Sequence, residues 1–254
     1  IDYQAIAIFC ALGFMLDDDT FYKEIKTCNP ATKYVLDENN IIVDERKYWQ
    51  WHYSPNDSSF IQIIDEFSVL IEKLVKNQIE NKSILLPISG GLDSRSLFVP
   101  LQNRSDLSLC SYEFDGGFSE SETGRKLSQC FNIPFYSQKI QRGYLWNKLD
   151  KFFELNNYFT DFTHPRQVNA IDNWKGLGDV ILLGHWGDVL FDKQVDQENI
   201  SYEEQVVKLK KKLIKPDGSE LARDLWKHWG LAGSFESYIT DRLDKLYSDI
   251  DVDH

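Results

Sequence analysis

Short apolar runs alternate along the chain with longer stretches in which apolar residues recur at helical spacing. The runs predict buried strands at residues 84–88, 107–114, 134–140 and 179–183. Helical spacing predicts helices at residues 60–79, 95–102 and 119–131, across most of 141–176, and in several segments of 201–247. Strands that alternate with helices form a parallel sheet with crossover helices. We therefore predict an α/β fold: a parallel sheet with flanking helices.

The first 52 residues differ from this pattern and predict a small β-rich segment. We interpret the short apolar run Ile6–Leu16 as a core strand, and the residues around a turn at 37–40 as a β-hairpin. The acidic residues Asp17–Asp19 indicate a solvated helix start, with Asp19 or Thr20 as its cap. Residues 54–59 indicate a linker. We expect one domain at residues 1–52 and a second at residues 57–254.

The most informative stretch joins the strand at 84–88 to the helix that follows it. It contains Ser89, Gly90, Gly91, Leu92, Asp93 and Ser94. Glycines let a backbone approach an anion closely, and the free amides and dipole of a new helix attract it. The two serines add hydroxyl donors. The stretch predicts a phosphate-binding loop. The alternative is a tight turn with Asp93 or Ser94 as N-cap, which accounts for fewer of these residues.

Asp93 narrows this prediction, because a carboxylate beside a phosphate is repelled unless a cation lies between them. Mg²⁺ takes carboxylate and phosphate oxygens together, so Asp93 is a candidate magnesium ligand. The pattern G-x-x-x-x-G-K-[ST] is excluded, since no lysine follows the glycines. The order Ser-Gly-Gly-Leu-Asp-Ser resembles instead the loop of the ATP pyrophosphatase (PP-loop) family, which cuts ATP between its α and β phosphates.

A second strand, at residues 179–183, also runs into a glycine turn that holds a carboxylate. Gly184, His185 and Asp188 belong to this turn. If the two strands are parallel, Asp188 and Asp93 lie at the same sheet edge, where ligands of such sheets bind. Two carboxylates flanking a polyphosphate can hold Mg²⁺. Asp188 could instead be a helix N-cap, and His185 could be a phosphate donor, a general base or a structural turn residue.

Composition argues against several other functions. The net charge of −12 disfavours a nucleic-acid partner, because affinity for phosphate backbones comes from Lys and Arg. The apolar run at residues 6–16 is too short to span a membrane and follows no basic segment, so we expect no membrane association and a cytoplasmic location. The four cysteines show no C-x-x-C spacing, so we expect free thiols and no zinc site.

The order of the motifs is similar to that of the synthetase domain of the asparagine synthetase family. The phosphate-binding loop comes first, the strand Leu109–Phe114 next, and the turn Gly184–Asp188 last. Leu16–Ile25 and Tyr48–Trp49 also resemble the closing strands of that family's glutaminase domain. Residues 1–52 are therefore expected to be the C-terminal part of a glutaminase-like (Ntn) domain. The resemblance extends to about residue 192.

The resemblance implies a two-step, ATP-dependent ligation. A substrate carboxylate is adenylated with release of pyrophosphate, and ammonia, with glutamine as one source, attacks the acyl-adenylate to give an amide. By position, the pyrophosphate would be held by Ser89, Gly90, Gly91, Asp93 and Ser94. Asp93 and Asp188 would bind Mg²⁺, with His185 as a further catalytic candidate. Gly184 and the backbone near Phe114 would meet the adenosine. A homodimer is a compatible assembly.

Departures from the family pattern keep other functions open. Trp186 replaces a small residue, Val189 replaces an acidic one, and His185 stands where glutamate is common. The family's N-terminal cysteine nucleophile and its downstream lysine cannot be placed, so no glutaminase activity is expected of this chain. The Gly-His-x-Gly-Asp order resembles divergent members found in polysaccharide biosynthesis. The alternatives are a catalytically impaired nucleotide-binding module and another PP-loop chemistry.

Overall fold

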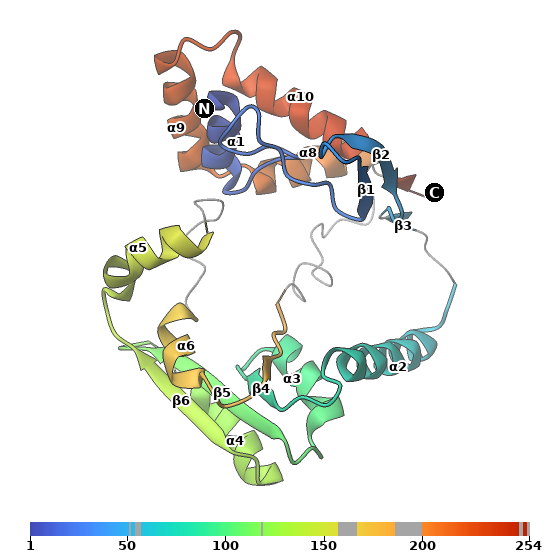
Figure 1. The fold of residues 1–254 in the computed structure, drawn as a ribbon, viewed down its shortest axis with the longest axis vertical. Helices are drawn as coiled ribbons and strands as arrows, with labels where there is room; N and C mark the ends of the chain where they lie inside the picture. Colours follow the sequence, from blue (N-terminus) through green and yellow to red (C-terminus); the bar gives the residue numbers. More distant parts are fainter. Residues whose placement is uncertain are drawn as a thin grey trace. The chain divides into compact units, whose positions relative to one another are not determined.

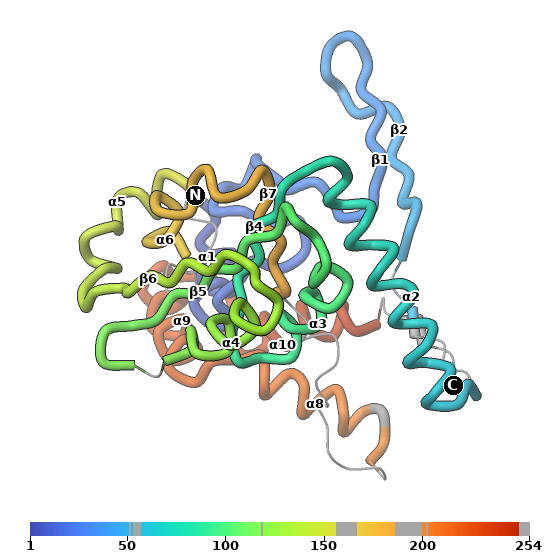
Figure 2. The backbone as a smooth tube through the Cα atoms, turned by 90° about the horizontal axis from the view of Figure 1, so that it is seen from below, coloured from blue at the N-terminus to red at the C-terminus, as the bar shows by residue number. Residues whose placement is uncertain are grey.

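The computed structural model describes residues 1–50, 52–53, 57–117, 119–156, 167–185, 200–248 and 251–252. The chain forms two compact units. We call them the sheet unit, which contains the strands between residues 84 and 181, and the terminal unit, which contains both ends of the chain. Figures 1 and 2 show the elements of each unit, and each is described by itself.

A parallel four-stranded sheet forms the centre of the sheet unit. Its strands are β4 (Ile84–Pro87), β5 (Leu107–Phe114), β6 (Phe135–Ile140) and β7 (Val180–Ile181). Their order is β6-β5-β4-β7, and every neighbouring pair is parallel. The predicted α/β fold is confirmed. The chain moves outward from β4 to β6 and then returns to the other side of β4. Ligands of open α/β sheets bind at the carboxyl ends of the strands where the order reverses in this way.

Helices cover both faces of this sheet. The helices of this unit are α2 (Phe60–Gln78), α3 (Leu92–Phe98) with the short 3₁₀ helix η1 (Val99–Leu101), α4 (Ser121–Phe131), α5 (Tyr144–Asn156) and α6 (Val168–Trp174). Successive side chains of β4 point to opposite faces. Leu86 packs on one face, in a core that includes Val75 of α2 and Phe98 of α3. Leu85 packs on the other face with Trp174 of α6. Figure 1 shows α4 and α6 on opposite sides of the sheet.

The terminal unit combines a helical cluster with a hairpin. Its elements are α1 (Tyr3–Leu12), β1 (Thr32–Leu36), β2 (Ile42–Lys47), β3 (His52–Tyr53), α8 (Tyr202–Leu213), α9 (Pro216–His228), α10 (Phe235–Ser248) and β8 (Asp251–Val252). β1 and β2 pair antiparallel, so the predicted hairpin is confirmed, while β3 pairs with β8 in parallel. In Figure 1, α1 lies against α9, and α10 runs beside them. Residues Ile8 of α1, Trp226 of α9 and Phe235 of α10 belong to one buried apolar core.

The predicted core strand at Ile6–Leu16 is wrong, because Tyr3–Leu12 form helix α1. Asp2 caps this helix, and its carboxylate accepts hydrogen bonds from the amides of Gln4 and Ala5, both at 3.1 Å. Gly13 ends the helix with a φ of 83°, in the left-handed region that glycine adopts freely. Both caps are visible in the sequence. Since the helix is apolar on nearly every side, however, its periodicity does not separate it from a strand.

The predicted solvated helix start at Asp17–Asp19 is also wrong. These residues form a turn that leads into irregular backbone. Asp19 and Thr20 are only 7% and 1% exposed, and neither caps a helix. The Asp19 carboxylate accepts hydrogen bonds from Lys26 at 2.9 Å and from Arg242 of α10 at 2.8 Å. The Asp19 carboxylate therefore links this turn to α10, the last described helix.

The two units divide the chain differently from the predicted boundary. The break between residues 56 and 57 matches the expected linker, but α8, α9 and α10 belong to the terminal unit and not to the sheet unit. The expected PP-loop domain at residues 57–254 stays a prediction. The glutaminase-like character of residues 1–52 stays a prediction.

Two expectations drawn from composition can be compared with the structure. The four cysteines are free thiols, as predicted. Burial raises the pKa of Cys110 to about 12, so this thiol in β5 is unreactive near neutral pH. None of the helices in the described ranges is long and apolar enough to cross a membrane.

Candidate functional site

A cavity of about 230 Å³ opens at the carboxyl ends of the sheet, where the strand order reverses. It is lined by residues of β5, of the segments after β4 and β7, and of three helix starts: Pro87, Ile88, Ser89, Gly91, Asp93, Ser94, Ser111, Tyr112, Glu120, Gln167, Leu183, Gly184 and His185. The loop after β4 and the loop after β7 thus meet at one site. This is the place where an open α/β sheet binds its ligand.

The loop after β4 is closed by its own serines. The Ser94 hydroxyl accepts a hydrogen bond from the Ser89 amide at 3.2 Å, and the two hydroxyl oxygens are also 3.2 Å apart. The Ser89 hydroxyl accepts a further bond from the Gly91 amide at 3.2 Å. Both serines line the cavity. Their hydroxyls are held at the mouth of the loop, where they can donate to an anion instead of to each other.

The two glycines of this loop leave open surface. Neither adopts a positive φ, so the turn itself does not require glycine. A Cβ atom at Gly90 would meet nothing closer than the Thr123 hydroxyl at 3.8 Å. At Gly91 it would stand 3.3 Å from the Ser89 hydroxyl. The absence of side chains bares the backbone, which suits the close approach of a ligand.

The alternative in which Asp93 or Ser94 caps α3 is wrong. Gly91 is the N-cap residue, and no side chain bonds the free amides of this helix start. Asp93 lies in the first turn, half-buried, and lines the cavity. A carboxylate in a first turn is favoured by the partial positive charge of the helix start. Its position therefore allows its side chain to face a bound anion with a cation between them.

A magnesium ion fits the carboxylates of this cavity. Within the described ranges, no three His, Cys, Asp or Glu side chains gather as a closed metal site. The cavity does contain two carboxylates, Asp93 and Glu120. Mg²⁺ usually keeps several waters and is bound by one or two carboxylates together with substrate phosphates. The donor set suits a metal that arrives with a phosphate better than a resident ion.

Gly184 lies directly against the start of α3. A Cβ atom there would stand 3.1 Å from the Asp93 carbonyl carbon and 3.2 Å from the Ser94 amide nitrogen, so a larger residue would push the two loops apart. His185 is exposed and lines the cavity, and its Nε2 lies 3.4 Å from Nε2 of the Gln167 side-chain amide. Asp188, Trp186 and Val189 lie outside the described residues, so the second predicted metal ligand stays a prediction.

Phe114 and Gly90 are not among the residues that line the cavity. Phe114 ends β5, and its ring packs against Tyr112 and Tyr144, with ring centres 6.0 and 5.8 Å away. Its contact with an adenosine stays a prediction. The next residue inward, Glu113, accepts hydrogen bonds from the Ser119 and Ser121 hydroxyls, both at 3.0 Å. These hydrogen bonds position the segment that contains Glu120, so that Glu120 lines the cavity.

Sequence reasoning missed four lining residues: Ser111, Tyr112, Glu120 and Gln167. Ser111 donates to the Ile88 carbonyl and so ties β5 to the end of β4. Glu120 follows a Gly-Gly turn at a strand end, which is a signal that could have placed it in the site. Nothing in the local sequence marks Gln167.

A larger cavity, of about 550 Å³, runs along the edge strand β6 beside Trp174. Its lining contains one charged residue, Lys139, and none of the loop residues described above. Lys139 is engaged with Asp115 at 2.9 Å. The candidate functional site is therefore the smaller cavity, where the loops converge.

The fold and the cavity define an α/β protein with a candidate ligand site at the reversal point of a parallel sheet. No protein-family model matches the chain, and no curated protein matches it. Among solved structures, the chain is similar to a glutamine-dependent NAD+ synthetase from Acinetobacter baumannii in complex with ADP, with a TM-score of 0.36 and 13% identity. The match covers 61% of this chain and 30% of the synthetase. A likeness this weak assigns neither a family nor a function.

Proposed function

We propose that this protein is an ATP-dependent ligase of the PP-loop class that forms an amide, in the manner of asparagine synthetases. The observation that supports the proposal is the convergence of two loops on one cavity. Ser89, Asp93 and Ser94 of the Ser-Gly-Gly-Leu-Asp-Ser loop line it together with Gly184 and His185 of the loop after β7. Convergence at the carboxyl edge of a parallel sheet is what a nucleotide site requires.

Each group of residues in the site has its own role in the proposed reaction. The loop serines and the bared backbone at Gly90 and Gly91 hold the β and γ phosphates of ATP. A substrate carboxylate oxygen then bonds to the α phosphorus as the bond to the pyrophosphate oxygen breaks. Asp93 would hold Mg²⁺, which when bound neutralises charge on the departing pyrophosphate. Charge stabilisation of this kind is the main protein contribution to phosphoryl and adenylyl transfer.

His185 would serve the second step. Ammonia attacks the acyl carbon of the adenylate, the new nitrogen loses a proton, and AMP leaves with the electron pair of the acyl–oxygen bond. His185 lines the cavity, where a ring nitrogen of its imidazole can accept that proton. Asp188 is retained in the proposal as a second magnesium ligand. The cavity is smaller than the range of about 300–1,000 Å³ typical of whole-ligand sites, which suits the phosphate end of a nucleotide.

A second candidate function is a nucleotide-binding module without ligase activity. Among the residues described around the cavity, no Lys or Arg contributes to the lining. A cation that stabilises the developing charge is a usual part of enzymes that transfer phosphoryl groups. A module that binds ATP without cleaving it needs no such residue.

Pyrophosphate exchange tests the ligase proposal. The full chain is incubated with ATP, Mg²⁺, labelled pyrophosphate and a panel of small carboxylic acids. One acid should support exchange of label into ATP. Asp93→Asn and Ser94→Ala should each lower that exchange at least about 100-fold, as expected for lost transition-state contacts. Asp65→Asn on α2 and Ser96→Ala on α3 are matched controls at exposed positions and should leave it unchanged.

Binding measurements separate the two candidates. Calorimetry should show ATP binding that requires the divalent ion, and Mn²⁺ resonance spectra should show a bound ion that is lost in Asp93→Asn. ATP binding without exchange for any acid would support the binding module and contradict the ligase. A wild-type chain that binds neither ATP nor the ion would contradict both.

A further inference from the structure

Strand β6 lies at the edge of the parallel sheet. Among the described strands, β5 is its one neighbour, and Figure 1 shows it at the margin of the sheet. Tyr136, Ser137 and Lys139 are exposed, and the cavity of about 550 Å³ runs along residues 135–139. An edge strand offers backbone N–H and C=O groups to another extended segment, so β6 is a candidate interaction surface.

The backbone groups of β6 point alternately toward β5 and toward the open edge. The Pro134 carbonyl accepts a hydrogen bond from the Leu109 amide of β5 at 2.8 Å. The even-numbered residues therefore bond to β5, and the N–H and C=O groups of Phe135, Ser137 and Lys139 point outward. Within the described part of the chain, no hydrogen bond reaches these outward groups. They are available to another strand.

Two residues that commonly protect an edge strand do not block this one. Proline and lysine are the usual devices. Pro134 is an even-numbered residue, so its missing N–H lies on the side of β5 and not at the open edge. The Lys139 ammonium lies 2.9 Å from the Asp115 carboxylate of its own chain, so its charge is already balanced.

The cavity beside β6 contains a hydrogen-bond donor without an acceptor. Trp174 of α6 lines the cavity and is 3% exposed, and its indole Nε1 has no partner in the described structure. Gln138 projects toward α6, because its side-chain amide donates to the Asn169 carbonyl at 3.2 Å. Tyr136, two residues earlier, projects to the same side and is 41% exposed. Since an unpaired buried donor is destabilising, the cavity favours an occupant that supplies an acceptor.

The open edge of β6 is complementary to that of a second β6. In an antiparallel ladder, two outward-facing residues that lie opposite each other exchange two hydrogen bonds. A register centred on Ser137 sets Ser137 opposite Ser137 of the other copy and Phe135 opposite Lys139. It uses every outward group of the strand and places no like charges opposite each other. On the side of α6, it sets Tyr136 of each copy opposite Gln138 of the other.

We propose that two copies of this chain pair through β6, antiparallel and centred on Ser137, so that their sheets become continuous. Tyr136 of each copy enters the cavity of the other, and its hydroxyl oxygen accepts a hydrogen bond from the Trp174 indole N–H. A twofold axis makes the two contacts identical. The proposal is independent of the ligase activity, because this cavity shares no lining residue with the cavity at the loop after β4.

Sedimentation velocity of the full chain over a dilution series tests the proposal. The wild type should be a dimer that dissociates as it is diluted. Ser137→Pro should weaken the dimer at least about tenfold, because proline lacks the N–H at the centre of the pairing. Ser137→Ala is the matched control, since it keeps that N–H, and should leave the dissociation constant unchanged. A monomeric wild type, or equal effects of the two variants, would overturn the proposal.

Hydrogen exchange tests the pairing in the wild type itself, without a substitution in the strand. At concentrations where the dimer predominates, the outward amides of Ser137 and Lys139 should exchange at least about tenfold more slowly than in the dilute monomer. The amides of Tyr136 and Gln138 bond to β5 in both states and should change less. Equal changes in the two groups of amides would overturn the pairing through this edge.

Tyr136→Phe tests the contact in the cavity. It removes the acceptor from both cavities and should weaken the dimer at least about fivefold, since two hydrogen bonds are lost. Tyr48→Phe is the matched control, because Tyr48 is 71% exposed and lies outside β6. Circular dichroism should be the same for both variants and the wild type. A Tyr136→Phe dimer as strong as the wild type would overturn the placement of Tyr136 in the cavity.

Discussion

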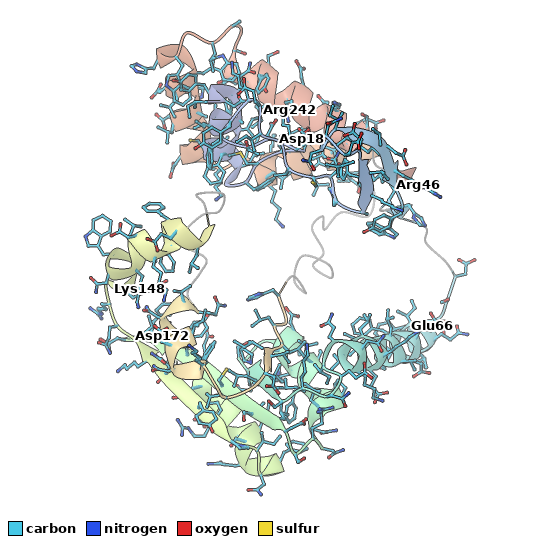
Figure 3. The ribbon with its side chains drawn as sticks, viewed as in Figure 1. Asp18, Arg46, Glu66, Lys148, Asp172 and Arg242 are labelled. Carbon is cyan, nitrogen blue, oxygen red and sulfur yellow. The ribbon has the colours of Figure 1, made fainter. Side chains whose placement is uncertain are left out.

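A single buried carboxylate joins two parts of the terminal unit that lie far apart in sequence. Asp19 is hydrogen-bonded to Lys26 and to Arg242, and Arg242 also contacts Asp17 at 2.9 Å. Figure 3 shows Arg242 close to the acidic turn that includes Asp18. Burial by itself raises the pKa of Asp19, but the hydrogen bonds from Lys26 and Arg242 together hold that pKa below its usual value. Folding therefore stabilises the ionised form.

Asp19→Asn should destabilise the terminal unit and change its response to acid. A depressed folded-state pKa gives stability that is present above the unfolded pKa, about 3.9, and is lost as the pH falls through the folded pKa. The variant should lose about 1–3 kcal/mol of unfolding free energy at pH 7. Its stability should also fall less steeply below pH 5. Urea unfolding at a series of pH values measures both.

Asp18→Asn is the control for this prediction. Asp18 is 42% exposed and forms one ion pair with Lys26 at 3.3 Å, so its loss should cost less than about 1 kcal/mol. An Asp19 variant with the same acid profile as the wild type would contradict the role given to the buried carboxylate.

At the level of elements, α1 and α9 approach each other unusually closely. A Cβ atom on Gly218 of α9 would stand 2.1 Å from the Cys10 carbonyl oxygen of α1. Gly218 has no positive φ, so backbone strain is not the reason for glycine here. The reason is space, since a backbone oxygen cannot move aside as a flexible side chain can.

Gly218→Ala should therefore destabilise the protein, although glycine to alanine within a helix normally stabilises it. The clash with the α1 backbone should outweigh the gain in helix propensity and lower the unfolding free energy by about 1–3 kcal/mol. Thermal unfolding followed by circular dichroism measures the effect. Glu220→Ala, an exposed change on the same helix, should shift it by less than about 0.5 kcal/mol. A stabilised Gly218→Ala protein would show that the helices can separate.

The sheet was predictable because its strands are buried on both faces. Leu85 and Leu86 point to opposite faces, and both are fully buried, so β4 reads as a continuous apolar run. Helix α1 is equally apolar, and its short run was mistaken for a strand. Asp2 at the N-cap and Gly13 at the C-cap indicate a helix, which the periodicity of the apolar residues does not. The local sequence therefore predicts a helix or strand correctly where the apolar pattern and the capping residues indicate the same element.

The sequence predicted residues of the cavity lining where a loop at a strand end carries several of them, as at residues 89–94 and at Gly184 and His185. Ser89, Asp93 and Ser94 are consecutive or nearly so, and their chemistry indicated a phosphate loop. Glu120 and Gln167 enter the cavity from the start of α4 and the segment before α6. Their positions depend on how these helices pack on the sheet. The local spacing of residues in a single sequence does not show how these helices pack.

At the scale of the whole chain, the last described helices belong with the first. Trp226 of α9 and Leu243 of α10 are buried in the same core as Ile8 and Ala11 of α1. More than 200 residues separate α1 from α9 along the chain. The linker expected at residues 54–59 lies at the division between the two units, which falls after residue 56. The composition of a linker is local, so it does not indicate which later segments pack with the residues before it.

Deletion of residues 1–56 tests this division. Without α1, the buried faces of α9 and α10 have no partner, so their amides should exchange hydrogen for deuterium at least about 100-fold faster than in the full chain. Amides of β4 and β5 should keep their protection, because the sheet's own core lies within residues 57–193. Exchange followed by mass spectrometry of peptides compares the two groups within one sample. If α9 and α10 stayed protected, residues 57–254 would fold as one body, and the domain boundary expected from the sequence would be right.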